Sequence, residues 1–165
     1  MSLLENESVK RVRAALLDAG VGDKVIELSE TARSAQDAAD SIGTELGSIV
    51  KSLVFLIGDQ PVMALVAGDH KCKPDQLPRT LNLDDLGEVS QADADAVRTA
   101  TGFSIGGVPP VGLASPLPTA MDVSLKRFET IYAAAGHPHC VFPTTVKELR
   151  RLSDAIISYA IAERG

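Results

Sequence analysis

One strongly apolar segment, Ile49–Ile57, constrains the fold more than any other part of this chain. Its apolar residues fall on both faces of an extended segment, which is typical of a central strand that is buried on both sides. The polar stretch Gly58-Asp59-Gln60 then predicts a hairpin into a second apolar strand, Pro61–Ala67. Pro61 is compatible with this assignment because it stands at the start of the strand. The sequence therefore predicts a sheet with an apolar hairpin at its centre.

Helical patterns precede this hairpin. Near the N-terminus, apolar residues recur at helical spacing before a glycine that ends the pattern: Val9, Val12, Leu16 and Ala19, then Gly20. Ser34–Asp37 resembles a capping box and opens a second predicted helix, which we expect to end at Gly47.

The second half of the chain is expected to mix helices with short strands. Residues 69–100 look mainly helical and polar, with Ser90–Asp93 as another capping box and Gly102 as the C-cap. Thr145–Glu148 is a third capping box and predicts a helical region that runs to Glu163. Short strands are expected at four places: Val25–Leu28, Met121–Val123, Thr130–Ala134 and Cys140–Phe142.

Length and composition favour an ordinary globular protein. A chain of 165 residues has the length of one domain, so the order of elements predicts one α/β domain, residues 1–165, with helices flanking a mixed sheet. With 16 Lys+Arg and 22 Asp+Glu the net charge is −6, which argues against overall electrostatic attraction to nucleic acid. No apolar run is long enough to span a bilayer, and the N-terminus has no signal-peptide pattern. The two cysteines form no CxxC pair, so we expect reduced thiols and a cytoplasmic location.

Lys51 is the residue of the apolar strand that most needs an explanation. By the two-residue period of a strand it shares a face with Ile49, Leu53 and Phe55. An unpaired buried ammonium is costly, so Lys51 either faces a functional cleft or extends to solvent from the start of the strand. Ser52 points to the opposite face, which argues against a Ser–Lys catalytic pair. Both interpretations of Lys51 stay open.

The segment Thr101–Pro118 contains four glycines and four prolines among apolar residues, which indicates a shaped loop rather than a flexible linker. Paired Gly106 and Gly107 let the backbone approach a ligand closely, and their N–H groups can bind a carbonyl or an anion. No Gly-Lys-Ser/Thr follows, which excludes a Walker loop, and Pro109-Pro110 excludes a dinucleotide fingerprint. A tight structural turn is the alternative.

Two histidines and a cysteine lie close together in Gly136–Cys140. Such residues can bind a metal, but no second ligand pair with the expected spacing occurs elsewhere in the chain. We therefore predict a hairpin turn whose histidines are exposed or face a cleft, and no metal site.

Several motifs occur in a fixed order between Thr31 and Leu152. They are Thr31-Ala32, Ala38-Ala39, the strand Ile49–Phe55 with its lysine, Gly68-Asp69, Gly102-Phe103, Gly106–Gly112, Asp122 and Ala135-Gly136. Together they resemble the YbaK/ProX family of aminoacyl-tRNA deacylases, which is related to the editing domain of bacterial prolyl-tRNA synthetases.

The resemblance implies a strongly curved mixed sheet and hydrolysis of the ester that joins a wrong amino acid to the 3′ end of tRNA. It implies water as the nucleophile and neither cofactor nor metal. Lys51 would anchor the phosphate of the terminal nucleotide or position the ester, and Gly106 and Gly107 would offer N–H groups to the ester carbonyl. The resemblance further implies a set of substrate-binding residues: Thr31, Asp69, Ser104, Val108, Pro109, Asp122, Gly136 and His137.

The implied partner is the acceptor end of an aminoacyl-tRNA, on which the protein would act in trans. Prolyl-tRNA synthetase or another synthetase is a second implied partner, and neither a membrane nor a specific DNA site is expected. Two functions of other classes stay open: a nucleic-acid-binding regulator, and a non-catalytic module that binds a small ligand, tRNA or a synthetase.

Overall fold

Two long antiparallel strands form the centre of the fold. In the computed structural model, which describes residues 2–29 and 32–165, β2 (Ile49–Ile57) pairs with β3 (Gln60–Ala67) from Val50 onward. A two-residue turn joins them, and Gly58 adopts a positive φ of 60° there. Both predicted strands and the hairpin between them are confirmed.

Further strands extend this hairpin into a mixed sheet. Their bounds are β1 (Ile26–Glu27), β4 (His70–Cys72), β5 (Val89–Gln91), β6 (Thr119–Asp122), β7 (Ile131–Ala134), β8 (Cys140–Thr144), β9 (Ile156–Ser158) and β10 (Ala162–Arg164). Among the described residues eight strands form one sheet, in the order β1-β8-β7-β2-β3-β6-β9, with β5 also paired to β2. The pairs β2–β7, β3–β6 and β6–β9 are parallel and the other pairs of this sheet are antiparallel. The predicted mixed α/β fold is therefore confirmed; β4 and β10 form a separate small sheet.

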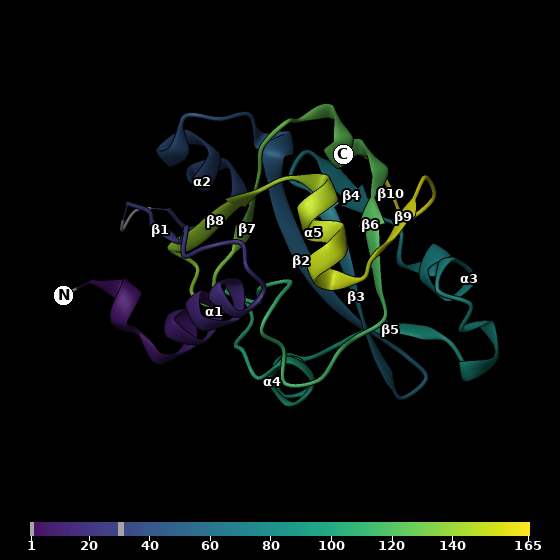
Figure 1. The fold of residues 1–165 in the computed structure, drawn as a ribbon. Coiled ribbons are helices and arrows are strands. Elements are labelled where there is room, and N and C mark those ends of the chain that lie inside the picture. Colours follow the sequence, from purple (N-terminus) through teal and green to yellow (C-terminus); the bar gives the residue numbers. More distant parts are fainter. Residues whose placement is uncertain (1, 30–31) are drawn as a thin grey trace.

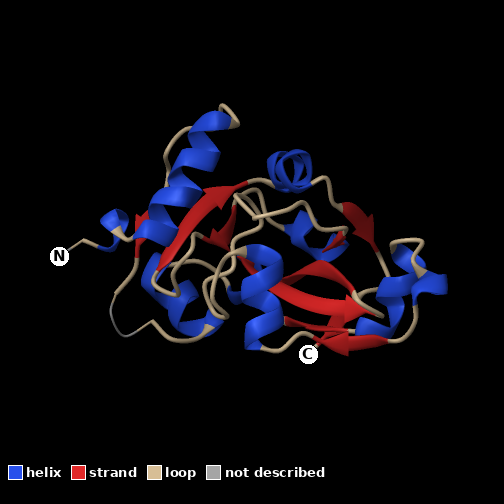
Figure 2. Ribbon diagram, turned by 90° about the horizontal axis from the view of Figure 1, so that it is seen from below, coloured by secondary structure: helices blue, strands red, loops and turns tan. Residues whose placement is uncertain are grey.

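Helices cover both faces of β2, as Figures 1 and 2 show. Their bounds in the described part of the chain are α1 (Glu7–Asp18), α2 (Ala35–Ile42), α3 (Leu77–Thr80), α4 (Ala94–Thr101) and α5 (Val146–Ser153). On one face, Val50 and Val54 belong to a core that includes buried residues of α1, α4 and α5. On the other face, Ile49 packs with α2, whereas Phe55 packs with α3. The apolar side chains on both faces of β2 are buried because helices pack against both faces.

Two of the three predicted capping positions are correct. Ser34 caps α2 by accepting the N–H of Asp37 at 3.1 Å, and Thr145 caps α5 by accepting the N–H of Glu148 at 3.0 Å. The capping box at Ser90 is wrong, because Ser90 lies in β5 and Asp93 caps α4 instead.

Several predicted boundaries also differ. The second helix ends at Ile42, not at Gly47, because Gly43 takes the left-handed conformation that ends helices. Helical segments do predominate in residues 69–100, as expected, but this part of the chain also includes the short strands β4 and β5, which the sequence did not predict. The C-terminal helix ends at Ser153, and β9 and β10 replace the helical region predicted up to Glu163. Within the described residues, no helix combines the length and the apolar character needed to cross a membrane.

Candidate active site

A cavity of about 580 Å³ follows one edge of β2. Every residue from Ile49 to Phe55 lines it. Because alternate residues of a strand point to opposite faces, an unbroken run of lining residues places the cavity along the edge of the strand rather than on one face.

The pairing of the sheet explains why this edge is open. Opposite β3, β2 pairs with β7 only at Ile49 and Val50 and with β5 only from Phe55 to Ile57. Figure 1 shows β7 beside the beginning of β2 and β5 beside its end. No strand therefore pairs with Lys51–Val54 along this edge in the described part of the chain.

Lys51 lies in this opening, between the part of β2 that α2 covers and the part that α3 covers. Its side chain is half-buried, and Nζ donates a hydrogen bond to the backbone carbonyl of His70 at 2.5 Å. None of the ion pairs found among the described residues includes Lys51. Of the two interpretations of Lys51, the structure favours a cationic group in a cleft.

The cavity is positively charged, although the whole chain has a net charge of −6. Arg33, Lys51 and Lys71 line it, and none of its lining residues in the described chain is Asp or Glu. Most of the other lining side chains are apolar, from α2, β2, β7, β8 and the loop at 105–108. Such a cavity suits a ligand that combines an anionic group with a small apolar one.

The glycine-proline loop contributes to the same cavity through Gly106 and Val108. The N–H of Gly107 is not available to a ligand, because it donates to the carbonyl of Ser104 at 3.2 Å. The carbonyl of Gly107 accepts the N–H of Gly136 at 2.9 Å, which holds the loop against the turn after β7. For the N–H groups of Gly106 and Val108, the described residues provide no acceptor. The N–H group of Ile105, which also lines the cavity, likewise has no acceptor among the described residues.

Close packing explains the glycines of these two loops. A Cβ atom on Gly107 would lie 2.8 Å from the backbone nitrogen of His137, and one on Gly136 would lie 2.7 Å from the carbonyl oxygen of Ser8. Gly136 also has a φ of 94°, in the left-handed region that favours glycine. These glycines can therefore form a tight structural turn and also let the backbone approach a ligand, so the two interpretations are compatible.

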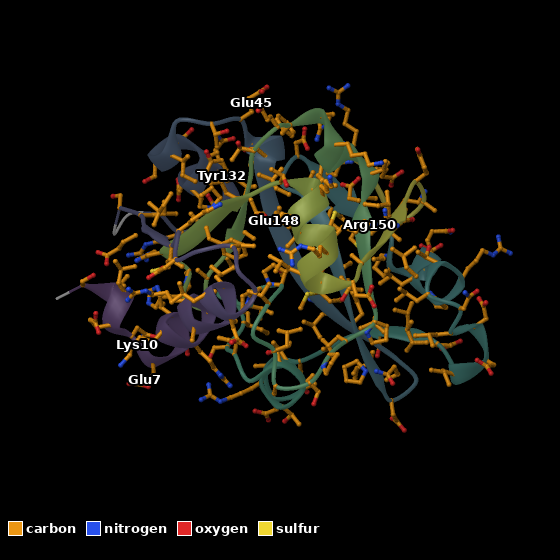
Figure 3. The ribbon with its side chains drawn as sticks, in the orientation of Figure 1. Glu7, Lys10, Glu45, Tyr132, Glu148 and Arg150 are labelled. Carbon is orange, nitrogen blue, oxygen red and sulfur yellow. The ribbon has the colours of Figure 1, made fainter. Side chains whose placement is uncertain are left out.

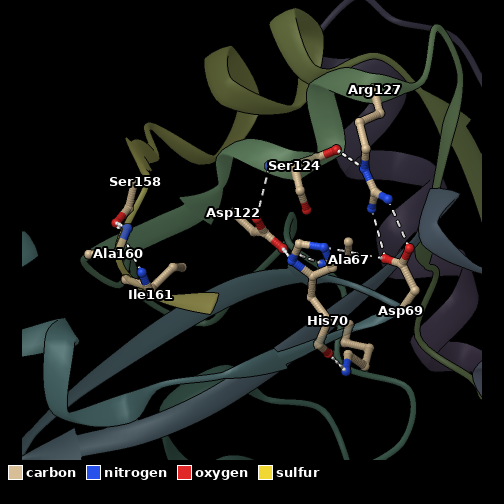
Figure 4. Close-up of polar contacts among 10 residues, drawn as sticks. Ala67, Asp69, His70, Asp122, Ser124, Arg127, Ser158, Ala160 and Ile161 are labelled. Atoms are coloured by element: carbon tan, nitrogen blue, oxygen red, sulfur yellow. Dashed lines mark hydrogen bonds and ion pairs between the residues drawn. The ribbon is translucent and has the colours of Figure 1, made fainter. Parts of the chain in front are cut away.

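Asp69 and Asp122 do not line the cavity; they lie on either side of His70 in a polar cluster (Figure 4). Asp122 is 3% exposed, and its carboxylate accepts the backbone N–H groups of Ala67 at 3.1 Å and Ser124 at 2.9 Å. Oδ2 of Asp122 also lies 3.4 Å from Nδ1 of His70, the residue whose carbonyl holds Lys51. Asp122 thus supports His70, whose backbone carbonyl accepts the hydrogen bond from Lys51.

Asp69 forms a two-point ion pair with Arg127 beside this cluster, with distances of 2.7 and 2.8 Å between the oxygens and the guanidinium nitrogens (Figure 4). The hydrogen bonds from Arg127 lower the pKa of Asp69, and Asp69 raises the pKa of Arg127. Both groups stay charged at neutral pH.

His137 lies next to the cavity without lining it, whereas its neighbour Pro138 does line it. Burial and the nearby charge of His139 lower the pKa of His137. Nδ1 of His137 accepts the backbone N–H of His139 at 3.1 Å, so the neutral ring bears its proton on Nε2. Across the described residues, no group of three His, Cys, Asp or Glu side chains is arranged to hold a metal.

The remaining predicted residues lie elsewhere. Ser104 is exposed and its Oγ accepts a hydrogen bond from Arg98 at 2.8 Å, while Pro109 is buried; neither lines the cavity. Thr31 lies outside the described residues.

No activated protein nucleophile is evident among the described residues of the cavity. Cys72 lines it, but burial raises the pKa of this thiol to about 11 against the opposing effect of the Lys51 charge. The thiol is therefore neutral at pH 7, and a neutral thiol is a poor nucleophile.

Sequence reasoning missed several residues of the cavity, including Arg33, Tyr132 and Ser52. The alternation of side chains along a strand predicts that Ser52 and Lys51 point to opposite faces. Both residues nevertheless line the cavity, because it lies at the strand edge. A sequence pattern does not indicate which part of a strand edge stays unpaired in the sheet.

A larger hollow of about 1060 Å³ lies near α5 and contains none of the predicted site residues. Its basic lining residues are Lys126, Lys147, Arg150 and Arg151. Figure 3 shows Arg150 on α5, and Glu7 and Lys10 on the separate helix α1. This hollow has basic residues but lacks the loop donors and the open strand edge of the smaller cavity.

Comparison with known proteins agrees with the sequence motifs. The sequence model of the aminoacyl-tRNA editing domain matches residues 29–152. The uncharacterized protein YwhH of Bacillus subtilis is 34% identical over 147 residues, which cover 88% of this chain and 91% of YwhH. An Enterococcus faecalis protein named "Putative Cys-tRNA(Pro)/Cys-tRNA(Cys) deacylase EbsC" is 29% identical over 110 residues, covering 66% of this chain and 65% of that protein.

A solved structure shares the fold closely. It is described as "a putative trans-editing enzyme for prolyl tRNA synthetase" and superimposes with a TM-score of 0.88 at 38% identity. The match covers 97% of this chain and 99% of that one. By the family match over most of its length and by this likeness, the chain belongs to the aminoacyl-tRNA editing domain family.

Proposed function

We propose that this protein is an aminoacyl-tRNA deacylase that hydrolyses mischarged aminoacyl-tRNA in trans, as one editing domain comprising residues 1–165. The observation that carries the proposal is that one cavity is lined by Lys51, with Arg33 and Lys71, and by Gly106 and Val108, whose N–H groups have no acceptor among the described residues. The names of the relatives, a Cys-tRNA deacylase and a trans-editing enzyme, support the same reaction. Since aminoacyl-tRNA is made and used in the cytoplasm, the proposal requires the protein to act there.

In the proposed reaction a water molecule attacks the ester carbonyl. The C–O bond to the terminal ribose breaks, the ribose hydroxyl regains a proton, and the amino acid leaves as a carboxylate. The N–H groups of Gly106 and Val108 stabilise the negative charge that develops on the carbonyl oxygen. Gly107 contributes through its backbone, because its two hydrogen bonds set the shape of the loop.

Lys51, with Arg33 and Lys71, attracts the terminal phosphate of the acceptor end. Asp122 contacts His70, whose carbonyl accepts the hydrogen bond from Lys51, and the Asp69–Arg127 pair fixes the turn that precedes His70. Gly136 and His137 support the loop at the rim of the cavity. Asp69, Asp122, Gly136 and His137 thereby act as positioning residues in this proposal.

The test is a deacylation time course with tRNAs charged with alanine, serine, threonine, cysteine or proline. Wild type is compared with Lys51→Ala and with Lys10→Ala, an exposed lysine on α1 that serves as a matched control. We expect one ester to be cleaved well above the buffer rate, with a loss of at least about a hundredfold in Lys51→Ala and no change in Lys10→Ala. Thermal unfolding of each variant verifies that it folds.

The proposal fails if no ester is cleaved above the buffer rate. Binding of tRNA or of prolyl-tRNA synthetase without cleavage would then support a non-catalytic binding module. A shift of duplex DNA at physiological salt would support a nucleic-acid-binding regulator.

A further inference from the structure

The open edge of β2 presents backbone hydrogen-bonding groups to the cavity. Along a strand, alternate residues direct their N–H and C=O groups to the same neighbour. On the edge opposite β3, the carbonyl of Val54 accepts the N–H of Ala92 at 3.3 Å, and the N–H of Gly58 donates to Glu88 at 2.9 Å. The even-numbered residues therefore face this edge, and Ser52 is the even-numbered residue midway along the unpaired stretch.

Ser52 has unused hydrogen-bonding capacity at this position. No strand pairs with it on the cavity side, and within the described chain no acceptor or donor is found for its backbone groups there. Its Oγ atom is buried and also has no hydrogen-bond partner among the described residues. Buried polar groups are nearly always paired in folded proteins, so the unpaired backbone N–H and C=O groups of Ser52, a residue that lines the cavity, call for a ligand or water there, whereas Oγ is enclosed by protein.

The opening has the length of one amino-acid residue. β7 stops pairing with β2 at Val50, and the carbonyl of Val54 is already taken by Ala92. Between them, Ser52 alone retains both its N–H and its C=O for a partner. In an antiparallel ladder, two residues directly opposite each other exchange both of these bonds.

We propose that the aminoacyl group of the substrate binds as a one-residue β-strand opposite Ser52. The α-amino group donates to the carbonyl of Ser52, and the N–H of Ser52 donates to the carbonyl of the ester. This pairing adds a donor to those of Gly106 and Val108 and needs no contact with the amino-acid side chain. The inference rests on the proposed function, because it assigns a role in binding the same substrate.

The pairing also orients the side chain of the amino acid. Directly opposite residues of an antiparallel pair project their side chains to the same face. An L-amino acid would therefore point toward the face of Ser52, Val50 and Val54, away from Lys51. The enzyme would recognise the main chain of an L-aminoacyl ester at the edge of β2. It would recognise the side chain of the amino acid on the face of β2 that carries Val50 and Val54.

The first experiment changes the substrate instead of the protein. It uses the tRNA ester that is cleaved in the deacylation panel and its desamino counterpart, in which hydrogen replaces the α-amino group. The kcat/KM of each is divided by the uncatalysed hydrolysis rate of the same ester, because the amino group itself activates the ester. We expect this ratio to fall at least about tenfold for the desamino ester, since the carbonyl of Ser52 would stay unpaired. An unchanged ratio would overturn the inference.

The second experiment needs binding but no hydrolysis. Adenosine with an aminoacyl amide at its 3′ position is titrated into ¹⁵N-labelled protein, with the amino acid of the cleaved ester, or L-alanine if none is cleaved. We expect the Ser52 amide resonance to shift and its hydrogen exchange to slow, whereas the Leu53 amide, which faces β3, serves as the internal control. Binding without a change at Ser52, or no binding, overturns the inference. Absence of cleavage in the panel would instead contradict the proposed function.

Discussion

At the scale of single residues, the Asp69–Arg127 pair gives the fold a defined pH dependence. Arg127 lowers the pKa of Asp69 below the ordinary value of 3.8. The folded protein therefore binds a proton at Asp69 less readily than the unfolded chain does. The stability that the pair contributes is present above about pH 4 and is lost as the pH falls through the lowered pKa of the folded state.

We expect Arg127→Ala to lower the free energy of unfolding by about 1 kcal/mol at pH 7, because the pair is two-pointed but partly exposed. The difference from wild type should shrink at pH 3. Urea unfolding of both proteins at the two pH values measures it. Arg150→Ala is the control, since Arg150 is exposed and has no ion pair among the described residues. An equal loss for Arg127→Ala at both pH values would show that the pair does not titrate as described.

At the scale of elements, the turn after β7 determines where the glycine-proline loop lies. Gly136 donates its N–H to the carbonyl of Gly107, and it lies against the carbonyl of Ser8 in α1. A side chain at this position must meet that carbonyl and must also adopt a left-handed conformation. The position of the loop N–H groups at the cavity therefore depends on how the turn at Gly136 packs against the glycine-proline loop and against α1.

Gly136→Ala should lower the free energy of unfolding by about 2 kcal/mol or more, from the backbone strain together with the collision. Gly22→Ala is a matched control, because Gly22 has a similar φ of 83° but nothing within 4 Å of the added Cβ. The control should lose only about 1 kcal/mol, and deacylation should decrease in Gly136→Ala alone. Chemical denaturation and the deacylation assay measure both effects. Equal losses of stability would mean that the contact with Ser8 is readily relieved.

Elements with strong local signals were predictable from the sequence. The apolar hairpin of β2 and β3 and the caps at Ser34 and Thr145 depend on nearby residues, so sequence pattern was sufficient to find them. β9 and β10 have three residues each and exist because they pair with β6 and β4, which are distant in sequence. No local pattern could distinguish them from a continuation of α5.

The site was predictable to a similar extent. The sequence identifies Lys51 as a candidate because it is a cation in an apolar strand. It identifies the paired glycines as candidates because they belong to a shaped loop. That β5 and β7 both pair with the same edge of β2 and leave Ser52 unpaired is a property of the sheet. The contact between Asp122 and His70 likewise depends on the packing of β6 beside β3. Sequence pattern indicates residue types, whereas these contacts arise only from the topology.

At the scale of the whole molecule, charge restricts how much of a tRNA the protein can hold. The net charge of −6 opposes overall attraction of a polyanion, and the cavity with Arg33, Lys51 and Lys71 is locally basic. The surface near Lys126, Lys147, Arg150 and Arg151 is the other basic region described above. Under the proposed function, substrate recognition should therefore concentrate on the acceptor end of the tRNA, and a synthetase partner is one source of further affinity.

This restriction predicts that an aminoacylated minihelix with only the acceptor stem is cleaved nearly as well as full-length tRNA. We expect the two kcat/KM values to agree within about threefold, and log kcat/KM to fall with log salt at a slope of about −2 or shallower, as for two or three phosphate contacts. Steady-state kinetics between 50 and 200 mM salt, as an approximate working range, measures both. A loss above about tenfold for the minihelix, or a steeper slope, would show that the protein holds the body of the tRNA. Arg150→Glu would then separate the two basic regions, because it should reduce cleavage of full-length tRNA only if the hollow near α5 takes part.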